Sequence, residues 1–237
     1  MREENSFVKG IRDGLPICFG YLSVAFAFGI FAVANGMSVV ESVLMSMTNV
    51  TSAGQLAAVP IVATGGTIIE LAVSQLVINL RYALMSVSLS QKLGGSVHLI
   101  DRFVISFVNT DEVFAVASSQ DGAVGRKYLY GLILTPFLGW SVGTLLGAAA
   151  GHWLPEIVIS ALGIAIYGMF IAIVLPKAKG HRPTAFCVLI AIVLSCAFTY
   201  IPVLKGIPSG FTVIICAVLA AAVMAIAAPI REEEAHA

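Results

Sequence analysis

The residues Asn79, Arg81 and Tyr82 place an amide, a guanidinium and a phenol within four positions of a long apolar segment. Such groups can hold a small polar solute through hydrogen bonds and charge. On a helix, the spacing of Gln75, Asn79 and Tyr82 puts these side chains on one face, which Ser86 extends. We therefore expect these three residues and Arg81 to line a binding site for a solute.

Two adjacent acids, Asp111 and Glu112, follow in the next apolar segment. An arginine at the centre of a membrane helix costs about 2.5–3.5 kcal/mol, so Arg81 needs a counter-charge. Glu70 is about 16 Å away along the same helix, which is too far for direct pairing. We expect Arg81 to pair with Asp111 or Glu112, and the remaining carboxyl to bind a transported proton. The alternative is that both acids are wetted and structural.

A third polar group interrupts the apolar segment 41–63. Its centre contains Asn49, Ser52 and Gln55 together with threonines and a glycine. These side chains compete for backbone hydrogen bonds, and glycine adds backbone freedom. Unwound backbone survives in a membrane only where it faces protein or a cavity, and broken helices form the substrate sites of many transporters. We therefore assign these three residues to the substrate site; the alternative is a continuous helix.

The composition indicates the class of protein that carries these groups. Of 237 residues, 59% are hydrophobic and 11% are charged, whereas soluble domains carry about 25% charged residues. This composition predicts an all-α polytopic membrane bundle of about 7–8 transmembrane segments with broken or re-entrant helices. The expected segments are 14–35, 41–63, 66–91, 102–120, 127–150, 155–176, 183–203 and 209–230. The short segment 102–120 either crosses fully or re-enters.

The chain is expected to form one transmembrane domain over residues 1–237, with 10–120 and 125–230 as candidate repeated halves. Gly14-Leu-Pro-Ile-Cys-Phe-Gly-Tyr21 resembles the later stretch Ile133-Leu-Thr-Pro-Phe-Leu-Gly-Trp140. Transporters are often built from repeats. Chance reuse of glycine and proline in apolar helices explains the similarity about as well.

The lysines and arginines predict the orientation. If all eight segments cross and the N-terminus is cytoplasmic, nine positive residues lie inside and three outside, with Arg81 in the membrane. The inside set is Arg2, Lys9, Arg12, Arg126, Lys127, Lys177, Lys179, Arg182 and Arg231, and the outside set is Lys92, Arg102 and Lys205.

Other function classes lack their signatures in this sequence. The four histidines fall in expected loops or tails, and neither HExxH nor GxSxG occurs, so we expect no enzyme, no catalytic residue, no metal site and no cofactor. The four cysteines lie in apolar segments without CxxC spacing and are interpreted as packing residues. Equal numbers of basic and acidic residues, 13 each, give no indication of nucleic-acid binding.

The phrases GLPICFGYLSVAFAFG, SAGQLAA, INLRYALMSVSLSQKL and NTDEVFAVA, in this order, resemble the azaleucine-resistance (AzlC-type) branched-chain amino acid permeases. The resemblance covers nearly the whole chain. It implies export of branched-chain and related amino acids across the cytoplasmic membrane of a prokaryote. It also implies a two-component transporter in which this large subunit works with a small hydrophobic AzlD-type subunit.

The residues are consistent with a substrate that carries both a carboxylate and an ammonium group, which the guanidinium and the acids would hold. The leading hypothesis is therefore a secondary transporter, since no GxxxxGK[ST] motif for ATP occurs. A channel or facilitator for a small neutral solute is the alternative, and an assembly subunit without transport is a further one. A homo-oligomer is possible.

Overall fold

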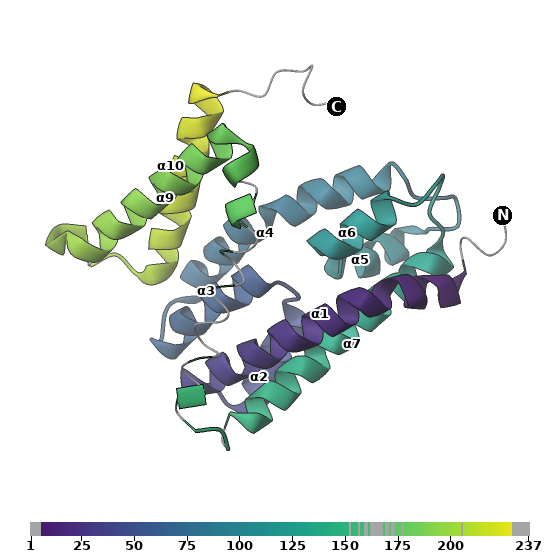
Figure 1. Ribbon diagram of the computed structural model, residues 1–237, viewed down its shortest axis with the longest axis horizontal. Coiled ribbons are helices and arrows are strands. Elements are labelled where there is room, and N and C mark those ends of the chain that lie inside the picture. The colour runs from purple at the N-terminus through teal and green to yellow at the C-terminus, as the bar shows by residue number, and fades with distance from the viewer. Residues whose placement is uncertain are drawn as a thin grey trace. The chain divides into compact units, whose positions relative to one another are not determined.

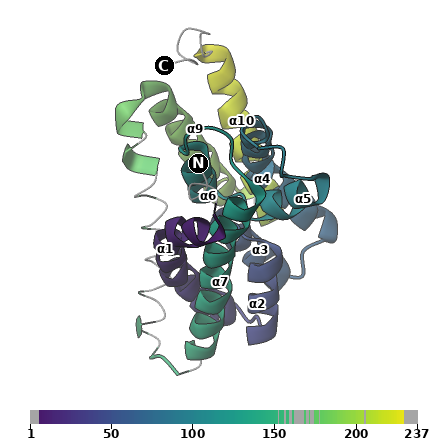
Figure 2. The same cartoon turned by 90° about the vertical axis from the view of Figure 1, so that its right-hand side faces the viewer.

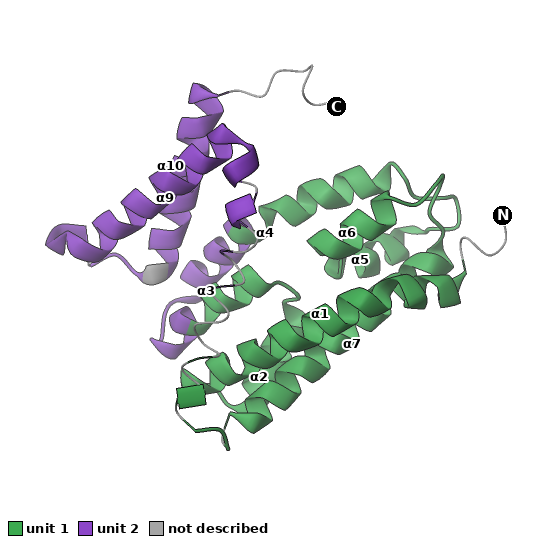
Figure 3. Ribbon diagram, in the orientation of Figure 1, with its two compact units in different colours: residues 1–59, 78–166 green, residues 60–77, 167–237 purple. Residues whose placement is uncertain are grey.

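The computed structural model describes residues 6–228 except 152, 156, 159, 160, 162–167, 169, 170, 172, 173, 177 and 205. The chain divides into two compact units (Figure 3). Unit 1 comprises residues 1–59 and 78–166, and unit 2 comprises residues 60–77 and 167–237. These boundaries do not coincide with the candidate halves 10–120 and 125–230, which stay a prediction together with the single domain.

Helices make up the regular structure of the described residues (Figure 1). They are α1 (Phe7–Ala34), α2 (Val39–Thr48), α3 (Ser52–Ala63), α4 (Ile68–Ser90), α5 (Leu99–Phe107), α6 (Asp111–Ser118), α7 (Arg126–Ala150), α9 (Arg182–Tyr200), a short 3-10 helix (Pro202–Leu204) and α10 (Ser209–Ala227).

Five of these helices are long and apolar enough to cross a membrane: α1, α4, α7, α9 and α10. The predicted helical membrane bundle with broken helices is confirmed. The predicted segments 41–63 and 102–120 each divide into two short helices. The predicted segment 155–176 falls largely outside the described residues.

Helices α1 and α7 pack closely and run parallel, as the two views in Figures 1 and 2 show. Glycines permit the approach. A Cβ at Gly139 would lie 2.5 Å from the carbonyl oxygen of Cys18, and one at Gly143 would lie 2.5 Å from that of Leu22. The contact moves four residues toward the C-terminus on both helices, from Cys18 to Leu22 on α1 and from Gly139 to Gly143 on α7, so the helices are parallel. Both helices therefore begin at one end of unit 1, the first end, and finish at the other, the second end.

Helix α1 begins seven residues before the predicted segment 14–35. The hydroxyl of Ser6 caps it by accepting a hydrogen bond from the backbone N–H of Lys9 at 3.1 Å. Lys9 then pairs with Asp13 one turn later, and Asp13 accepts a 2.8 Å hydrogen bond from Tyr128 of α7. Tyr128 of α7 thus provides a hydrogen-bond partner for the polar first turns of α1, which stabilises them as helix. Hydropathy alone does not predict this contact.

In unit 2, a buried carboxylate joins the start of α4 to the start of α10. Glu70 is 4% exposed, and its Oε1 accepts a 2.9 Å hydrogen bond from the backbone N–H of Gly210. The first N–H groups of a helix lack intrahelical acceptors and favour a negative charge. Glu70 therefore stabilises the N-terminus of α10, and this hydrogen bond fixes its carboxylate.

Candidate functional site

The first polar break forms the tip of a hairpin made by α2 and α3. Met37, just before α2, packs against Phe28 and Ala32 near the end of α1. Val59 of α3 belongs to the same cluster. The chain therefore enters from the second end, turns at residues 49–51 and returns to the second end.

A buried polar network fixes this first hairpin to α7. Gln55 is fully buried, and its Nε2 donates to Ser46 Oγ at 2.7 Å while its Oε1 accepts from Trp140 Nε1 at 2.9 Å. Ser46 also hydrogen-bonds Thr144 at 2.5 Å. Both ends of the Gln55 amide are thus used inside the protein. These contacts hold Gln55 inside the protein, and the substrate-binding role predicted for it stays a prediction.

Helices α5 and α6 form a second hairpin that enters from the first end. An isolated β-bridge joins the segments before and after it: Gly94 donates its N–H to Val124 O at 2.9 Å, and Val124 donates to Lys92 O at 2.8 Å. The carboxylate of Asp101 lies 3.0 Å from the guanidinium of Arg126. Segment 102–120 thus returns to the side from which it came.

This geometry corrects the eight-crossing topology. That topology placed Lys92 and Arg102 on the side opposite Arg126. The segments that carry them lie together at the first end. Hydropathy did not distinguish one crossing helix from two short helices joined at a tip, since both are apolar stretches of similar length.

The two tips are built alike. In the first, Thr51 donates its N–H to Asn49 O at 2.8 Å, and its hydroxyl accepts from Gly54 N–H at 3.5 Å. In the second, Thr110 donates to Val108 O at 2.9 Å and accepts from the N–H three residues later at 3.5 Å. Each threonine ends the turn and caps the returning helix.

Side chains of α4 connect the two tips within unit 1. Arg81 Nη1 lies 2.6 Å from Asp111 Oδ2, at the start of α6. Arg81 Nη2 also donates to the hydroxyl of Tyr82 at 3.3 Å, and that hydroxyl donates to Thr51 Oγ1 at 3.3 Å. Of the two acids expected to pair with Arg81, the structure pairs it with Asp111.

This cluster lies near the middle of α4 and is open on one side. Arg81 lies about 20 Å from the start of α4 and about 14 Å from its end at 1.5 Å per residue. Its side chain is 48% exposed and that of Asp111 is 45% exposed. Ionisable groups at this depth avoid lipid. The open side of the pair must therefore face water, a solute or protein.

The second acid has a different partner. Glu112 accepts a hydrogen bond from the hydroxyl of Tyr21, at the middle of α1. The Tyr21 ring packs edge-on against Trp140, with 5.1 Å between ring centroids. The structure therefore separates the two acids: one neutralises a guanidinium, and the other is held by a phenol.

Asn109 at the second tip connects to α4 as well. It is 2% exposed, and its Nδ2 donates to Ser86 Oγ at 3.1 Å. Its Oδ1 is buried and has no hydrogen-bond partner among the described atoms. The predicted stripe on α4 thus reaches both tips, through Tyr82 to the first and through Ser86 to the second.

The other predicted residues divide into two groups. Asn49 and Ser52 flank the first tip, next to Thr51. Asn79 lies one turn before the Arg81–Tyr82 pair on α4, whereas Gln75 belongs to the part of α4 assigned to unit 2. In the part of the chain that the structure describes, no three His, Cys, Asp or Glu side chains come together as a metal site.

Sequence reasoning missed Tyr21 and Trp140. Their signal was the internal echo, in which Gly-Tyr at 20–21 matches Gly-Trp at 139–140. Because α1 and α7 run parallel, these matched aromatic residues meet, and each contacts a different hairpin.

Comparison with known proteins agrees with this architecture. A family model described as AzlC protein matches residues 16–154. An uncharacterized membrane protein from Archaeoglobus fulgidus is 34% identical over 181 residues, which are 76% of this chain and 79% of the relative. Inner membrane protein YgaZ from Escherichia coli strain K12 is 30% identical over 195 residues, which are 79% of each protein. No solved structure matches the chain significantly. Since the family model spans more than half of the sequence and these relatives are membrane proteins, the chain is a membrane protein of the AzlC family.

Proposed function

We propose that the protein is a secondary transporter that exports branched-chain and related small neutral amino acids. The observation that carries this proposal is the meeting of two re-entrant hairpin tips, from opposite ends of unit 1, around Arg81, Asp111 and Tyr82. Broken backbone and ionisable side chains at mid-depth are features of solute pathways.

The substrate chemistry follows from the ion pair. An amino acid carries a carboxylate and an ammonium, which are the same charges that Arg81 and Asp111 neutralise in each other. A zwitterion can therefore insert into the pair without leaving either charge uncompensated. Asn49, Ser52, Asn79 and Tyr82 are proposed to complete the site. Apolar surroundings would accept an aliphatic side chain.

The opposed hairpins favour a carrier over a channel. One hairpin can withdraw toward the second end and the other toward the first, so each tip can uncover the shared site from a different side. Such alternation is the usual action of carriers built from broken helices. A channel would instead need both tips open at once.

Energy is proposed to come from an ion gradient, with Glu112 as the proton-binding carboxyl. Asp111 is already paired with Arg81, whereas Glu112 is held by an uncharged phenol. Glu112 contacts Tyr21 of α1, and its neighbour on α6, Asp111, is the acid that pairs with Arg81 of α4. Residues 131–150 of α7 contain no titratable side chain.

The family resemblance supports a small hydrophobic AzlD-type partner. Helices α9 and α10 offer apolar surface for such a subunit, since α9 has no buried residue among those described. We further propose the inner membrane of a prokaryote as the location, with a cytoplasmic N-terminus. A homo-oligomer stays a prediction.

The test is transport in proteoliposomes with and without the small subunit. We expect saturable uptake of labelled leucine that unlabelled leucine on the opposite side accelerates, and loss of this exchange in Arg81→Ala at equal protein content. Non-saturating flux without acceleration would indicate a channel. Absence of flux for leucine, valine, isoleucine and methionine in the two-subunit sample would overturn the proposal.

A further inference from the structure

An apolar groove of about 570 Å³ lies within unit 1 between α5 and α7. Val108 and Ile133 are each 5% exposed, whereas Phe103 and Phe107 are 70% and 50% exposed, so the groove has a buried floor and open walls. Its volume lies in the range of about 300–1,000 Å³ that is common for ligand pockets. The lining residues are Phe7, Phe103, Val104, Phe107, Val108, Tyr130, Ile133, Leu134 and Phe137. Eight of these nine side chains have no polar atom, so the groove suits a hydrocarbon rather than a polar solute.

The groove runs from the first end of unit 1 toward its middle. Phe7 is the first residue of α1, and Tyr130 lies one turn after α7 begins at Arg126. Phe137, the last lining residue of α7, lies eleven positions after Arg126, which is about 16 Å along the helix axis. Helix α7 is long and apolar enough to cross a bilayer, and one leaflet contributes about 15 Å of hydrocarbon. The groove therefore has the length of an acyl chain in the leaflet nearer the first end.

Two basic residues lie on the face of α7 that lines the groove. The lining residues of α7 recur every three or four positions, which is the spacing of one helix face. Arg126 and Lys127 continue this face toward the first end. The guanidinium carbon of Arg126 lies 5.6 Å from the centroid of the Tyr130 ring, which lines the groove. Both basic side chains are exposed, so they lie where the headgroup of a lipid would follow its acyl chain.

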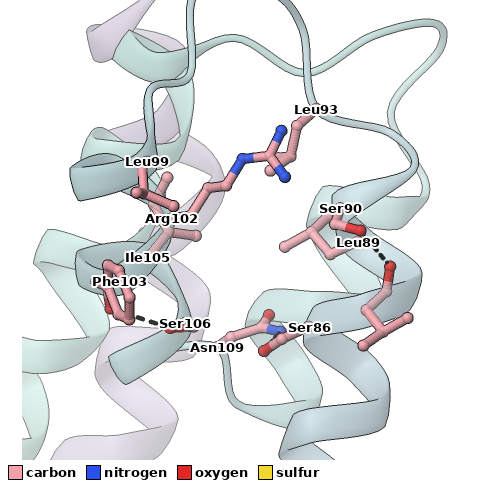
Figure 4. Close-up of a pocket in the computed structure, with 11 residues that line it drawn as sticks. Ser86, Leu89, Ser90, Leu93, Leu99, Arg102, Phe103, Ile105, Ser106 and Asn109 are labelled. Carbon is pink, nitrogen blue, oxygen red and sulfur yellow. Dashed lines mark hydrogen bonds between the residues drawn. The ribbon is translucent and has the colours of Figure 1, made fainter.

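A third basic residue lies near the same end. Figure 4 shows Arg102 extending toward Leu93 in the neighbouring pocket, on the side of α5 that faces α4. Leu93 forms a β-bridge with Val124, two residues before Arg126. Arg102 therefore adds to the positive charge at the first end.

The charge balance at this end favours an anion. Of the described residues, Arg126 pairs with Asp101, whereas Arg102 and Lys127 form no ion pair. Basic residues next to a membrane span attract anionic lipids, and each one near the surface raises the affinity about fivefold. A neutral helix of a partner protein would explain the apolar walls but not this excess of positive charge.

We propose that the groove binds an anionic phospholipid of the leaflet nearer the first end, with one acyl chain between α5 and α7 and the headgroup beside Arg126 and Lys127. The inference goes beyond the proposed function, because it concerns a lipid and not the transported solute. The lipid contacts both α7 and the first helix of the second hairpin, α5. Its binding is therefore expected to raise the melting temperature of the protein.

Quenching of tryptophan fluorescence by brominated lipid tests the site in the full chain. Phe107→Trp places an indole in the wall of the groove. Leu15→Trp is the control, since Leu15 is 40% exposed, does not line the groove and lies at a similar depth, next to Gly14, which packs against Pro136. The two native tryptophans give the same background in both variants. Gel filtration and thermal melting verify that both variants fold.

The variants are reconstituted in vesicles of dioleoylphosphatidylcholine. The vesicles contain either brominated phosphatidylglycerol or brominated phosphatidylcholine at the same low mole fraction. In Phe107→Trp, we expect an apparent affinity about fivefold or more higher for the brominated phosphatidylglycerol. Leu15→Trp should show no preference between the two lipids.

A charge variant in the Phe107→Trp chain tests the headgroup contact. We expect Lys127→Gln to lower the apparent affinity for phosphatidylglycerol about fivefold and to leave that for phosphatidylcholine unchanged. Lys179→Gln, which removes an exposed lysine of unit 2, should change neither affinity.

The opposite results would overturn the proposal. Equal quenching of Phe107→Trp by the two brominated lipids would mean that the groove is ordinary lipid-facing surface. An unchanged preference in Lys127→Gln would exclude the headgroup contact. If the small hydrophobic subunit protects Phe107→Trp from both lipids, or if protection grows with the ratio of protein to lipid, the groove is a protein interface and the lipid site is refuted. None of these results depends on leucine exchange, so the transport proposal is judged separately.

Discussion

Arg81 and Asp111, which are 30 residues apart in the chain, meet at 2.6 Å between α4 and the first residue of α6. The pair joins a long helix to the tip of the second hairpin. Neutralising Asp111 leaves the guanidinium of Arg81 without its counter-charge. We expect Asp111→Asn to lower the melting temperature in detergent and to stop leucine exchange.

The double variant Arg81→Gln/Asp111→Asn is the matched comparison. It removes both charges, so stability should return toward that of the native protein while transport stays lost. If the double variant melts as low as Asp111→Asn alone, the ion pair is not the origin of the effect.

Glu112 is expected to couple transport to protons. Glu112→Gln removes its negative charge but keeps the size of the side chain and its contact with Tyr21. We expect leucine exchange at equal pH to persist, and accumulation driven by a pH gradient to disappear. Asp121→Asn, at an exposed loop residue, serves as the control. Gradient-driven accumulation by Glu112→Gln at the native rate would exclude this role.

Gln55 is expected to support the structure of the first hairpin. Gln55→Leu leaves the indole N–H of Trp140 and the hydroxyl of Ser46 without their buried partner, at a cost of about 1–3 kcal/mol. Thermal melting should show this loss, while the KM for leucine changes little. Adding Trp140→Phe removes the orphaned donor and should restore part of the stability. A raised KM without a change in melting temperature would instead indicate substrate contact.

The close packing of α1 on α7 predicts a position-dependent effect of alanine. A Cβ at Gly143 would lie 2.5 Å from Leu22 O and 2.9 Å from Ala25 Cβ, whereas nothing lies within 4 Å of one at Gly20. We expect Gly143→Ala to destabilise by about 1–3 kcal/mol through overcrowding. Gly20→Ala should be neutral or slightly stabilising. Equal melting temperatures for the two variants would argue against this interface.

The hairpins predict a topology that labelling can check. In a chain whose four native cysteines are replaced, single cysteines at Gly95 and Asp121 should react with an impermeant thiol reagent from the same side, and one at Asn35 from the other. The eight-crossing topology instead groups Gly95 with Asn35. Suppose that segments 155–176, 183–203 and 209–230 each cross once. The lysines and arginines outside the bilayer then all lie on the side of the first end, except Lys205. The positive-inside rule then predicts that the first end is cytoplasmic.

Local composition was enough to predict some of these features. The break near Asn49 follows from the poor helix-forming residues around it, and the need of Arg81 for an acid follows from the cost of its charge. The partners of the buried polar residues Gln55 and Glu70, much further along the chain, were not predictable. The burial of Gln55 depends on Trp140, 85 residues later, and Glu70 is committed to the N-terminus of α10.

The sequence pattern also did not predict from which end of unit 1 each hairpin enters. Segment 102–120 has the hydropathy of a short crossing, and the pairing of Gly94 with Val124 together with the Asp101–Arg126 ion pair reveals that it turns back. Tyr21 was overlooked because the internal echo with Trp140 does not reveal which polar group the tyrosine contacts. Its role depends on Glu112, which reaches it from α6.

The parallel packing of α1 on α7 has a consequence for biosynthesis. Gly139 packs against Cys18 across 120 residues of intervening chain. Helix α1 is synthesised and enters the membrane long before α7 exists. Until then, the glycines of α1 that α7 packs against have no contact. Both hairpins precede α7 in the chain, and each hydrogen-bonds to it through Gln55 or Asp101. Assembly of unit 1 is therefore expected to finish only after α7 has been synthesised, and truncation before α7 should leave α1 open to degradation.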